Sequence, residues 1–79
     1  MRQTTIGEYR VGITFNPSGD STVNEIKTAA AALIDLVDGI NAPDQEIVRL
    51  KALAMTHIED AAMWAVKAAT KKLRQDDTT

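Results

Sequence analysis

The sequence of 79 residues contains no cysteine and only one histidine, His57. Disulfide bonds are therefore excluded, and so is a structural zinc site, which needs four nitrogen or sulfur ligands in one small volume. A domain of this size buries too little apolar surface to be comfortably stable without disulfides, a metal or a partner subunit. Because the first two are absent, we expect the chain to be stabilised as a homo-oligomer.

The chain also lacks an excess of positive charge and any long apolar run. It has 9 Lys and Arg residues against 11 Asp and Glu residues, which gives a formal net charge of -2. Proteins that coat DNA or RNA neutralise many phosphates, so this balance argues against them, whereas a few cations are enough to hold a small anion. Charges interrupt every hydrophobic stretch and no signal-peptide pattern is present, so we expect a soluble cytoplasmic protein that binds neither DNA nor membranes.

Groups that could perform catalysis are sparse. His57 and Glu59 match the first half of a zinc-deaminase motif, but the paired cysteines that this motif requires are missing. His57 and Asp60 lie one helical turn apart, a spacing more typical of a surface or interface pair than of a catalytic base. No nucleophile stands beside a base, and Ser18-Gly19-Asp20 lacks the lysine of a phosphate-binding loop. We predict a protein that is not an enzyme, with no catalytic residue, cofactor or metal.

Residues 1–19 differ in composition from the rest of the chain. They are rich in β-branched and aromatic residues and are interrupted by Gly7 and Gly12. They end in Asn16-Pro17-Ser18-Gly19, a sequence typical of turns. We predict an extended N-terminal arm and a turn.

The sequence from Thr22 to Gly39 predicts a first helix. Thr22 and Glu25 fit a capping box, and apolar residues follow at alternating intervals of three and four, which is the spacing of a helix-packing seam. Gly39 is the expected C-terminal cap. A helix over residues 22–39 is therefore predicted.

A second helix is predicted over residues 43–74, followed by a frayed tail at residues 76–79. Pro43 suits the first turn, and Asp44 and Glu46 suit the positive end of the helix. At about 1.5 Å per residue this helix spans about 45 Å against about 27 Å for the first, so the two cannot cover each other. Its overhanging, alanine-rich half must pack on the arm or on a second chain.

These elements predict a single all-α domain. Residues 20–75 form an antiparallel helical hairpin, to which residues 1–19 add an extended N-terminal arm. A dimer of hairpins that forms a four-helix bundle is the simplest way to bury both apolar seams. We therefore expect an oligomeric helix bundle.

Candidate ligand-binding residues are few, and each also has a structural explanation. Lys27 is the only cation of the first helix and lies beside Thr28 on its polar side. Tyr9 is either a packing anchor or a ring that stacks on a nucleobase, and Arg10 offers a planar cation to a phosphate or a base. Lys67 lies further inside the second helix than the cations that complement its dipole, so it is the better candidate for an anion contact, unless an acid of a neighbouring chain pairs with it.

Three segments together resemble a known family. They are Gly7-Glu8-Tyr9-Arg10, Asn24-Glu25-Ile26-Lys27 and, late in the second helix, Ala62-Met63-Trp64-Ala65-Val66-Lys67-Ala68. They look like the small phage sponges that counter CBASS, a bacterial defence in which a cyclic oligonucleotide activates a lethal effector. These sponges share a helical-hairpin domain with phage proteins that sequester the signals of Thoeris defence. The resemblance covers nearly the whole chain and implies an immune-evasion protein of the infected bacterial cytoplasm, which binds cyclic nucleotides without cleaving them.

The resemblance also implies roles for particular residues. In the family, a tyrosine ahead of the first helix stacks on a nucleobase and a lysine of that helix contacts the ligand, and Tyr9 and Lys27 match them. The implied ligands are cyclic dinucleotides such as cyclic GMP-AMP. Arg10 and Thr28, the neighbours of Tyr9 and Lys27 in sequence, are predicted as further ligand-binding residues. A basic residue late in the second helix, usually arginine, serves a second site for cyclic trinucleotides, and Lys67 takes its place without the bidentate fork of arginine. The family assembles as hexamers.

Two other interpretations stay open at this point. A structural or protein-binding helical oligomer of phage origin would use the alanine-rich helix face to grip a partner and would not respond to cyclic nucleotides. A DNA-binding regulator is disfavoured by the acidic balance and by the lack of a short helix-turn-helix.

Overall fold

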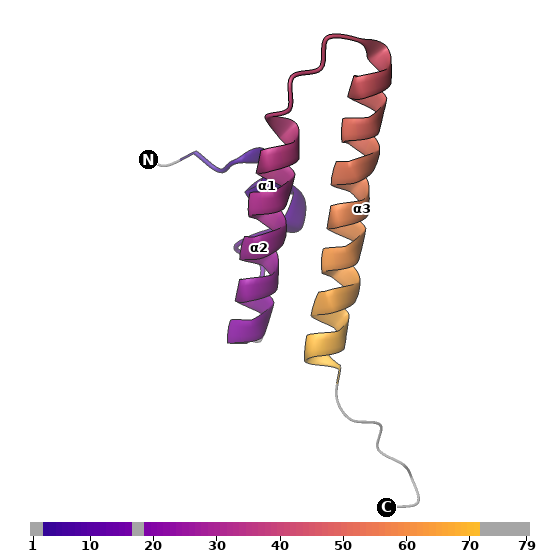
Figure 1. The fold of residues 1–79 in the computed structure, drawn as a ribbon. Helices are drawn as coiled ribbons and strands as arrows, with labels where there is room; N and C mark the ends of the chain where they lie inside the picture. The colour runs from indigo at the N-terminus through magenta and orange to yellow at the C-terminus, as the bar shows by residue number, and fades with distance from the viewer. Residues whose placement is uncertain (1–2, 17–18, 72–79) are drawn as a thin grey trace, which may run out of the picture.

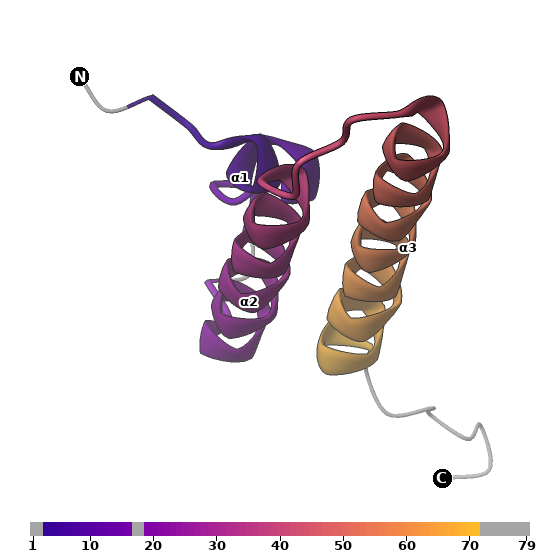
Figure 2. The same cartoon turned by 45° about the horizontal axis from the view of Figure 1, so that its top comes forward.

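The computed structural model describes residues 3–16 and 19–71 of the chain. Within these ranges it contains three helices and no strand: α1 (Ile6–Val11), α2 (Ser21–Asp38) and α3 (Gln45–Thr70). Helices α2 and α3 run antiparallel as a hairpin, and α1 lies against α2 (Figure 1, Figure 2). The predicted all-α helical hairpin is confirmed.

The sequence predicted an extended N-terminal arm. The structure differs, because Ile6–Val11 forms helix α1. Thr5 Oγ1 accepts a hydrogen bond from the backbone nitrogen of Glu8, and a carboxylate oxygen of Glu8 accepts one from the backbone nitrogen of Thr5, each at 3.0 Å. This capping box satisfies two backbone donors that an isolated turn would leave unpaired. Gly12 then ends the helix at φ +65°, a left-handed conformation that glycine adopts without strain. Local capping thus outweighs the strand propensity of the β-branched residues.

Helix α2 begins one residue earlier than predicted and has a different cap. Asp20, rather than Thr22, is its N-cap, because the Asp20 carboxylate accepts hydrogen bonds from the backbone nitrogens of Thr22 at 2.7 Å and Val23 at 3.4 Å. Gly39 is the C-cap, as predicted, and its nitrogen donates to the carbonyl oxygen of Asp35 at 3.1 Å.

Helix α3 begins two residues later than predicted. Asp44 is the N-cap and accepts a hydrogen bond from the nitrogen of Ile47 at 3.0 Å, so Pro43 precedes the helix instead of lying in its first turn. Thr70 is the last helical residue, whereas the predicted end at residue 74 and the frayed tail at residues 76–79 lie outside the described residues. With 26 residues against 18, α3 is the longer helix by about 12 Å.

The buried core lies where α1 covers α2, and we call it the arm-covered region. Gly7 brings the two backbones together, because a Cβ atom at this position would lie only 2.0 Å from the carbonyl oxygen of Ala31. The Gly7 nitrogen also donates a hydrogen bond of 2.7 Å to the Asp35 carboxylate. The buried side chains of the arm-covered region are Val23, Lys27, Ala31 and Ile34 of α2 and Ala62 of α3.

Large apolar side chains stay exposed near the loop between α2 and α3, a region that we call the loop end. The most exposed of them, Leu36, keeps 70% of its surface in solvent. The loop end extends over the last turns of α2, the loop and the first turns of α3, and its exposed large apolar residues are Leu36, Ile40, Val48, Leu50 and Leu53. No helix in the described ranges combines the length and the apolarity that crossing a membrane would require.

Candidate ligand-binding pocket

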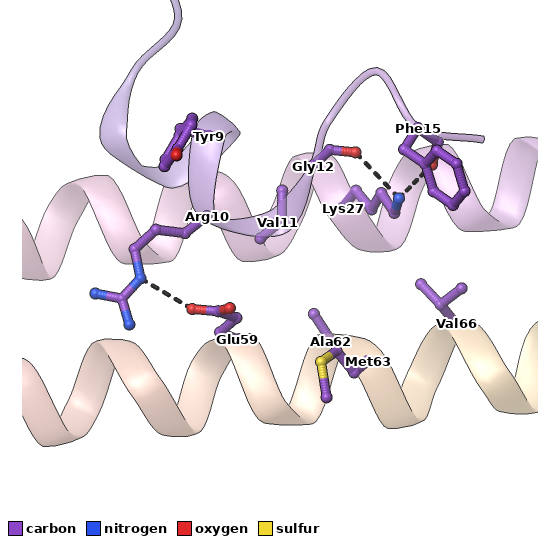
Figure 3. Close-up of a pocket in the computed structure, with 10 residues that line it drawn as sticks. All are labelled: Tyr9, Arg10, Val11, Gly12, Phe15, Lys27, Glu59, Ala62, Met63 and Val66. Atoms are coloured by element: carbon purple, nitrogen blue, oxygen red, sulfur yellow. Dashed lines mark hydrogen bonds and ion pairs between the residues drawn. The ribbon is translucent and has the colours of Figure 1, made fainter.

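A cavity of about 460 Å³ opens between the N-terminal arm and helix α3. Helix α1 and the turn after it form one wall, helix α3 forms the facing wall, and α2 contributes one lysine (Figure 3). The lining residues are Tyr9, Arg10, Val11, Gly12, Phe15, Lys27, Glu59, Ala62, Met63 and Val66. Three of the five predicted ligand-binding residues, Tyr9, Arg10 and Lys27, therefore line one pocket.

Lys27 is a buried cation in the wall of this pocket, with 8% of its surface exposed. Its ammonium donates hydrogen bonds to the carbonyl oxygens of Gly12, at 3.0 Å, and Phe15. It also lies 5.3 Å from the centre of the Phe15 ring, within the range of a cation–π interaction. Among the described residues no carboxylate forms an ion pair with Lys27. Carbonyl dipoles solvate the charge without cancelling it, so the pocket keeps a positive charge that attracts anions.

Arg10 ties the arm to helix α3 across the pocket. Its Nε donates to a carboxylate oxygen of Glu59 at 3.0 Å, and its Nη2 donates to the hydroxyl of Thr56 at 3.3 Å. Both members of the ion pair are partly buried. The pair neutralises Glu59, which is the carboxylate in the pocket lining, so the lining as a whole favours a negatively charged ligand.

Tyr9 lies at the edge of the pocket with 77% of its surface exposed. A ring with so much surface in solvent contributes little to the packing of the fold. Of the two roles that the sequence allowed for Tyr9, the exposure favours a platform for a ligand over a packing anchor.

Thr28 and Lys67 lie outside this pocket. Thr28 lines a smaller cavity of about 190 Å³, where Glu8 and Asp35 make the surroundings acidic. Lys67 is exposed on α3, with its Nζ atom 5.2 Å from the centre of the Trp64 ring. A single chain therefore does not bring these two residues to the site that Tyr9 and Lys27 share.

Seven lining residues of the pocket were missing from the predicted set, and two of them, Phe15 and Glu59, contribute an aromatic ring and a charge. Phe15 fell within the predicted N-terminal arm and was given no ligand-binding role, because its contact with Lys27, 12 residues away in the sequence, leaves no local signal. Glu59 was considered only as part of a zinc motif, and its position one turn before Ala62 on α3 is the signal that could have placed it in the site. In the ranges that the structure describes, no group of three or more His, Asp or Glu side chains is arranged to hold a metal.

The comparison with protein families decides which class of protein carries this pocket. The Acb2/Tad1 hairpin domain matches residues 8–70 of the chain. The chain belongs to the Acb2/Tad1 hairpin-domain family. This family comprises the anti-CBASS and anti-Thoeris sponges, known for sequestering cyclic nucleotides, which confirms the resemblance found in the sequence. No curated protein and no solved structure is significantly similar to this Acb2/Tad1 hairpin domain.

Proposed function

We propose that this Acb2/Tad1 hairpin domain binds cyclic dinucleotides such as cyclic GMP-AMP and withholds them, uncleaved, from bacterial CBASS effectors. The observation that carries the proposal is the convergence of Tyr9, Arg10 and Lys27 on one cavity of about 460 Å³. This volume falls within the range of about 300–1,000 Å³ that is typical of small-molecule sites. An exposed ring beside two cations suits a ligand that carries a nucleobase next to a phosphate.

The hydrogen-bonding capacity of the two cations supports this assignment. An ammonium has three N–H donors, and the carbonyl oxygens of Gly12 and Phe15 use two of those of Lys27, which leaves one for a phosphate oxygen. The guanidinium of Arg10 has five donors, and its contacts with Glu59 and Thr56 use two. Stacking on Tyr9 adds about 1–3 kcal/mol per base. Tight binding therefore needs no covalent step.

Sequestration follows from mass action alone. A bound second messenger cannot reach its effector, so a phage that produces more binding sites than signal molecules blunts the response without turnover. We propose that the protein acts in this way in the cytoplasm of the infected bacterium.

We further propose that the binding unit is a dimer of hairpins and that dimers assemble into a hexamer. A cyclic dinucleotide has near two-fold symmetry, so two copies of the chain can offer one Tyr9 and one Lys27 to each half of it. The exposed apolar side chains of the loop end support self-association, because a domain of this size gains stability by covering them.

A second site for cyclic trinucleotides is proposed for Thr28 and Lys67. The acidic side chains of Glu8 and Asp35 beside Thr28 disfavour a phosphate at that position in a single chain. A neighbouring chain that brings its Lys67 close would offset part of this negative charge and supply a cation for a phosphate. This site therefore depends on the proposed assembly.

Isothermal titration calorimetry tests the proposed function, with cyclic GMP-AMP, cyclic di-GMP and a cyclic tri-adenylate as ligands. We expect Tyr9→Ala to weaken the binding of cyclic GMP-AMP by at least about 5- to 150-fold, the loss for one stacked base, because the proposed dimer offers one Tyr9 to each of the two bases. Tyr9→Phe, which keeps the ring, serves as the control and should bind nearly as well as the natural chain. Ligand released by heating the complex should be recovered intact.

The alternative of a structural or protein-binding oligomer makes the opposite prediction. In that case none of the three ligands would release heat or raise the melting temperature. Recovery of linear or hydrolysed nucleotide after incubation would instead indicate an enzyme.

A further inference from the structure

Phe15 is a pocket residue whose exposure the packing of the fold does not explain. Its side chain keeps 70% of its surface in solvent, although an apolar ring is normally more stable when buried. Figure 3 shows Phe15 and Tyr9 at opposite ends of the pocket, with the Lys27 ammonium next to Phe15 and the Arg10–Glu59 pair on the side of Tyr9. Each end of the pocket thus has an exposed aromatic ring, with the Lys27 charge beside Phe15 and the Arg10–Glu59 ion pair beside Tyr9.

The backbone that carries the Phe15 ring is fixed on both sides. The Phe15 nitrogen donates to the carbonyl oxygen of Gly12 at 2.9 Å, and the Phe15 carbonyl oxygen accepts a hydrogen bond from Lys27. The next residue, Asn16, donates from its side chain to the carbonyl oxygen of Asp20, the N-cap of α2, at 2.9 Å. A backbone held in this way need not be ordered when a ligand stacks on the ring, so binding avoids that part of the entropic cost.

The charge beside the ring specifies the chemistry of the ligand. The Lys27 Nζ atom lies 5.3 Å from the ring centre, so a flat apolar surface and a positive charge are presented together. A nucleobase joined through its sugar to a phosphate carries the two complementary groups, a flat ring and a negative charge.

We propose that Phe15 is a second aromatic platform of the pocket, which stacks on a nucleobase while Lys27 holds the neighbouring phosphate. The inference rests on the proposed function and adds to it a contact made by a residue of the turn between α1 and α2. Lys27 then has two roles in the pocket: its ammonium contacts the Phe15 ring and it supplies the positive charge.

Calorimetry with cyclic GMP-AMP tests the proposal on the full chain. We expect Phe15→Leu, which keeps an apolar side chain but removes the flat ring, to weaken binding by about 5- to 150-fold, equivalent to about 1–3 kcal/mol. Phe15→Tyr is the matched control, because it keeps the ring and should stay within about twofold of the natural chain. The ligand-free variants should melt at nearly the same temperature as the natural chain, since the ring is exposed.

A fluorescent ligand separates stacking from a purely structural role of Phe15. In a cyclic dinucleotide analogue that carries 2-aminopurine in place of both bases, stacking quenches the emission of each base that lies on a ring. At saturating protein we expect less quenching with Phe15→Leu than with Phe15→Tyr. Equal quenching by the two variants, or equal losses of affinity, would overturn the stacking role.

The failure of this proposal is distinguishable from the failure of the proposed function. If Tyr9→Ala loses binding while Phe15→Leu binds like the natural chain, the second platform is wrong and the sponge function stands. If the natural chain itself does not bind cyclic GMP-AMP, both proposals are wrong.

Discussion

The two regions of the hairpin differ in how much of their apolar surface a single chain buries. In the arm-covered region, α1 lies on α2, and Val23, with 2% of its surface exposed, is as buried as a core residue of a much larger domain. At the loop end, Leu36 keeps 70% of its surface in solvent. The chain thus completes on its own the region that positions the pocket, and it leaves at the loop end an apolar surface suited to the proposed self-association. Three features occur once in each region and allow this comparison to be tested: a glycine, a lysine and an ion pair.

The glycine pair should give the largest difference. A Cβ at Gly7 would lie 2.0 Å from the carbonyl oxygen of Ala31, whereas a Cβ at Gly39 would lie no closer than 3.5 Å to its nearest neighbour. We expect Gly7→Ala to push α1 off α2 and to lower the free energy of unfolding by about 3 kcal/mol, the upper part of the range for overpacking. Gly39→Ala should change it by less than about 0.5 kcal/mol. Urea denaturation followed by circular dichroism measures both.

The two glycine variants should also differ in ligand binding. Because α1 carries Tyr9 and Arg10, Gly7→Ala should also abolish the binding of cyclic GMP-AMP, while Gly39→Ala should retain it. A Gly7→Ala variant of natural stability and affinity would show that the arm does not depend on its close contact with α2.

The lysine pair should give a smaller difference. Lys27 donates to the carbonyl oxygens of Gly12 and Phe15 inside the arm-covered region, and Lys51 donates to those of Asp38 and Ile40 at the loop, at 2.7 and 2.6 Å. We expect Lys27→Met to cost about 1–2 kcal/mol, because it leaves two partly buried carbonyl groups without a donor. Lys51→Met should cost about 0.5 kcal/mol, since water reaches the exposed carbonyl groups at the loop. Thermal unfolding of the two variants measures the difference.

The two lysine variants should also differ in function. Lys27→Met removes the buried charge and the support of the Phe15 ring, so it should weaken the binding of cyclic GMP-AMP strongly, whereas Lys51→Met should leave the affinity unchanged. Equal affinities of the two variants would show that the pocket does not use the Lys27 charge.

How far the sequence predicted this structure depends on the range of the interactions involved. Helix α2 was predicted to within one residue at each end, because its apolar spacing and the Gly39 cap are local signals. Helix α1 was missed although Thr5, Glu8 and Gly12 are local signals for it, because the β-branched residues of the arm favoured an extended chain. Only its docking on α2, through the hydrogen bond from Gly7 to Asp35 28 positions away, depends on a long-range contact. In the site, Tyr9 and Lys27 were chosen by family resemblance. The surroundings of Phe15 depend on a contact with Lys27 that no local pattern shows.

The ion pairs provide the last and smallest comparison. In the arm-covered region the Arg10–Glu59 pair joins two helices, whereas near the loop Arg49 and Glu46 pair within α3, with 59% and 61% of their side-chain surfaces exposed. The hydrogen bond from Arg49 lowers the pKa of Glu46 below its ordinary value, outweighing a small opposite effect of burial. A carboxyl whose pKa is lower in the folded state stabilises the fold above its unfolded pKa, and that contribution is lost as the pH falls through the lowered folded value. Because the pair is exposed, Arg49→Gln should make only a slight change in the melting temperature at pH 7. That change should disappear once the pH falls below the lowered pKa of Glu46, and it should shrink in high salt.

Arg10→Gln should lower the melting temperature more than Arg49→Gln at pH 7, since only the Arg10 pair holds two elements together. The reverse order would contradict the division between the two regions.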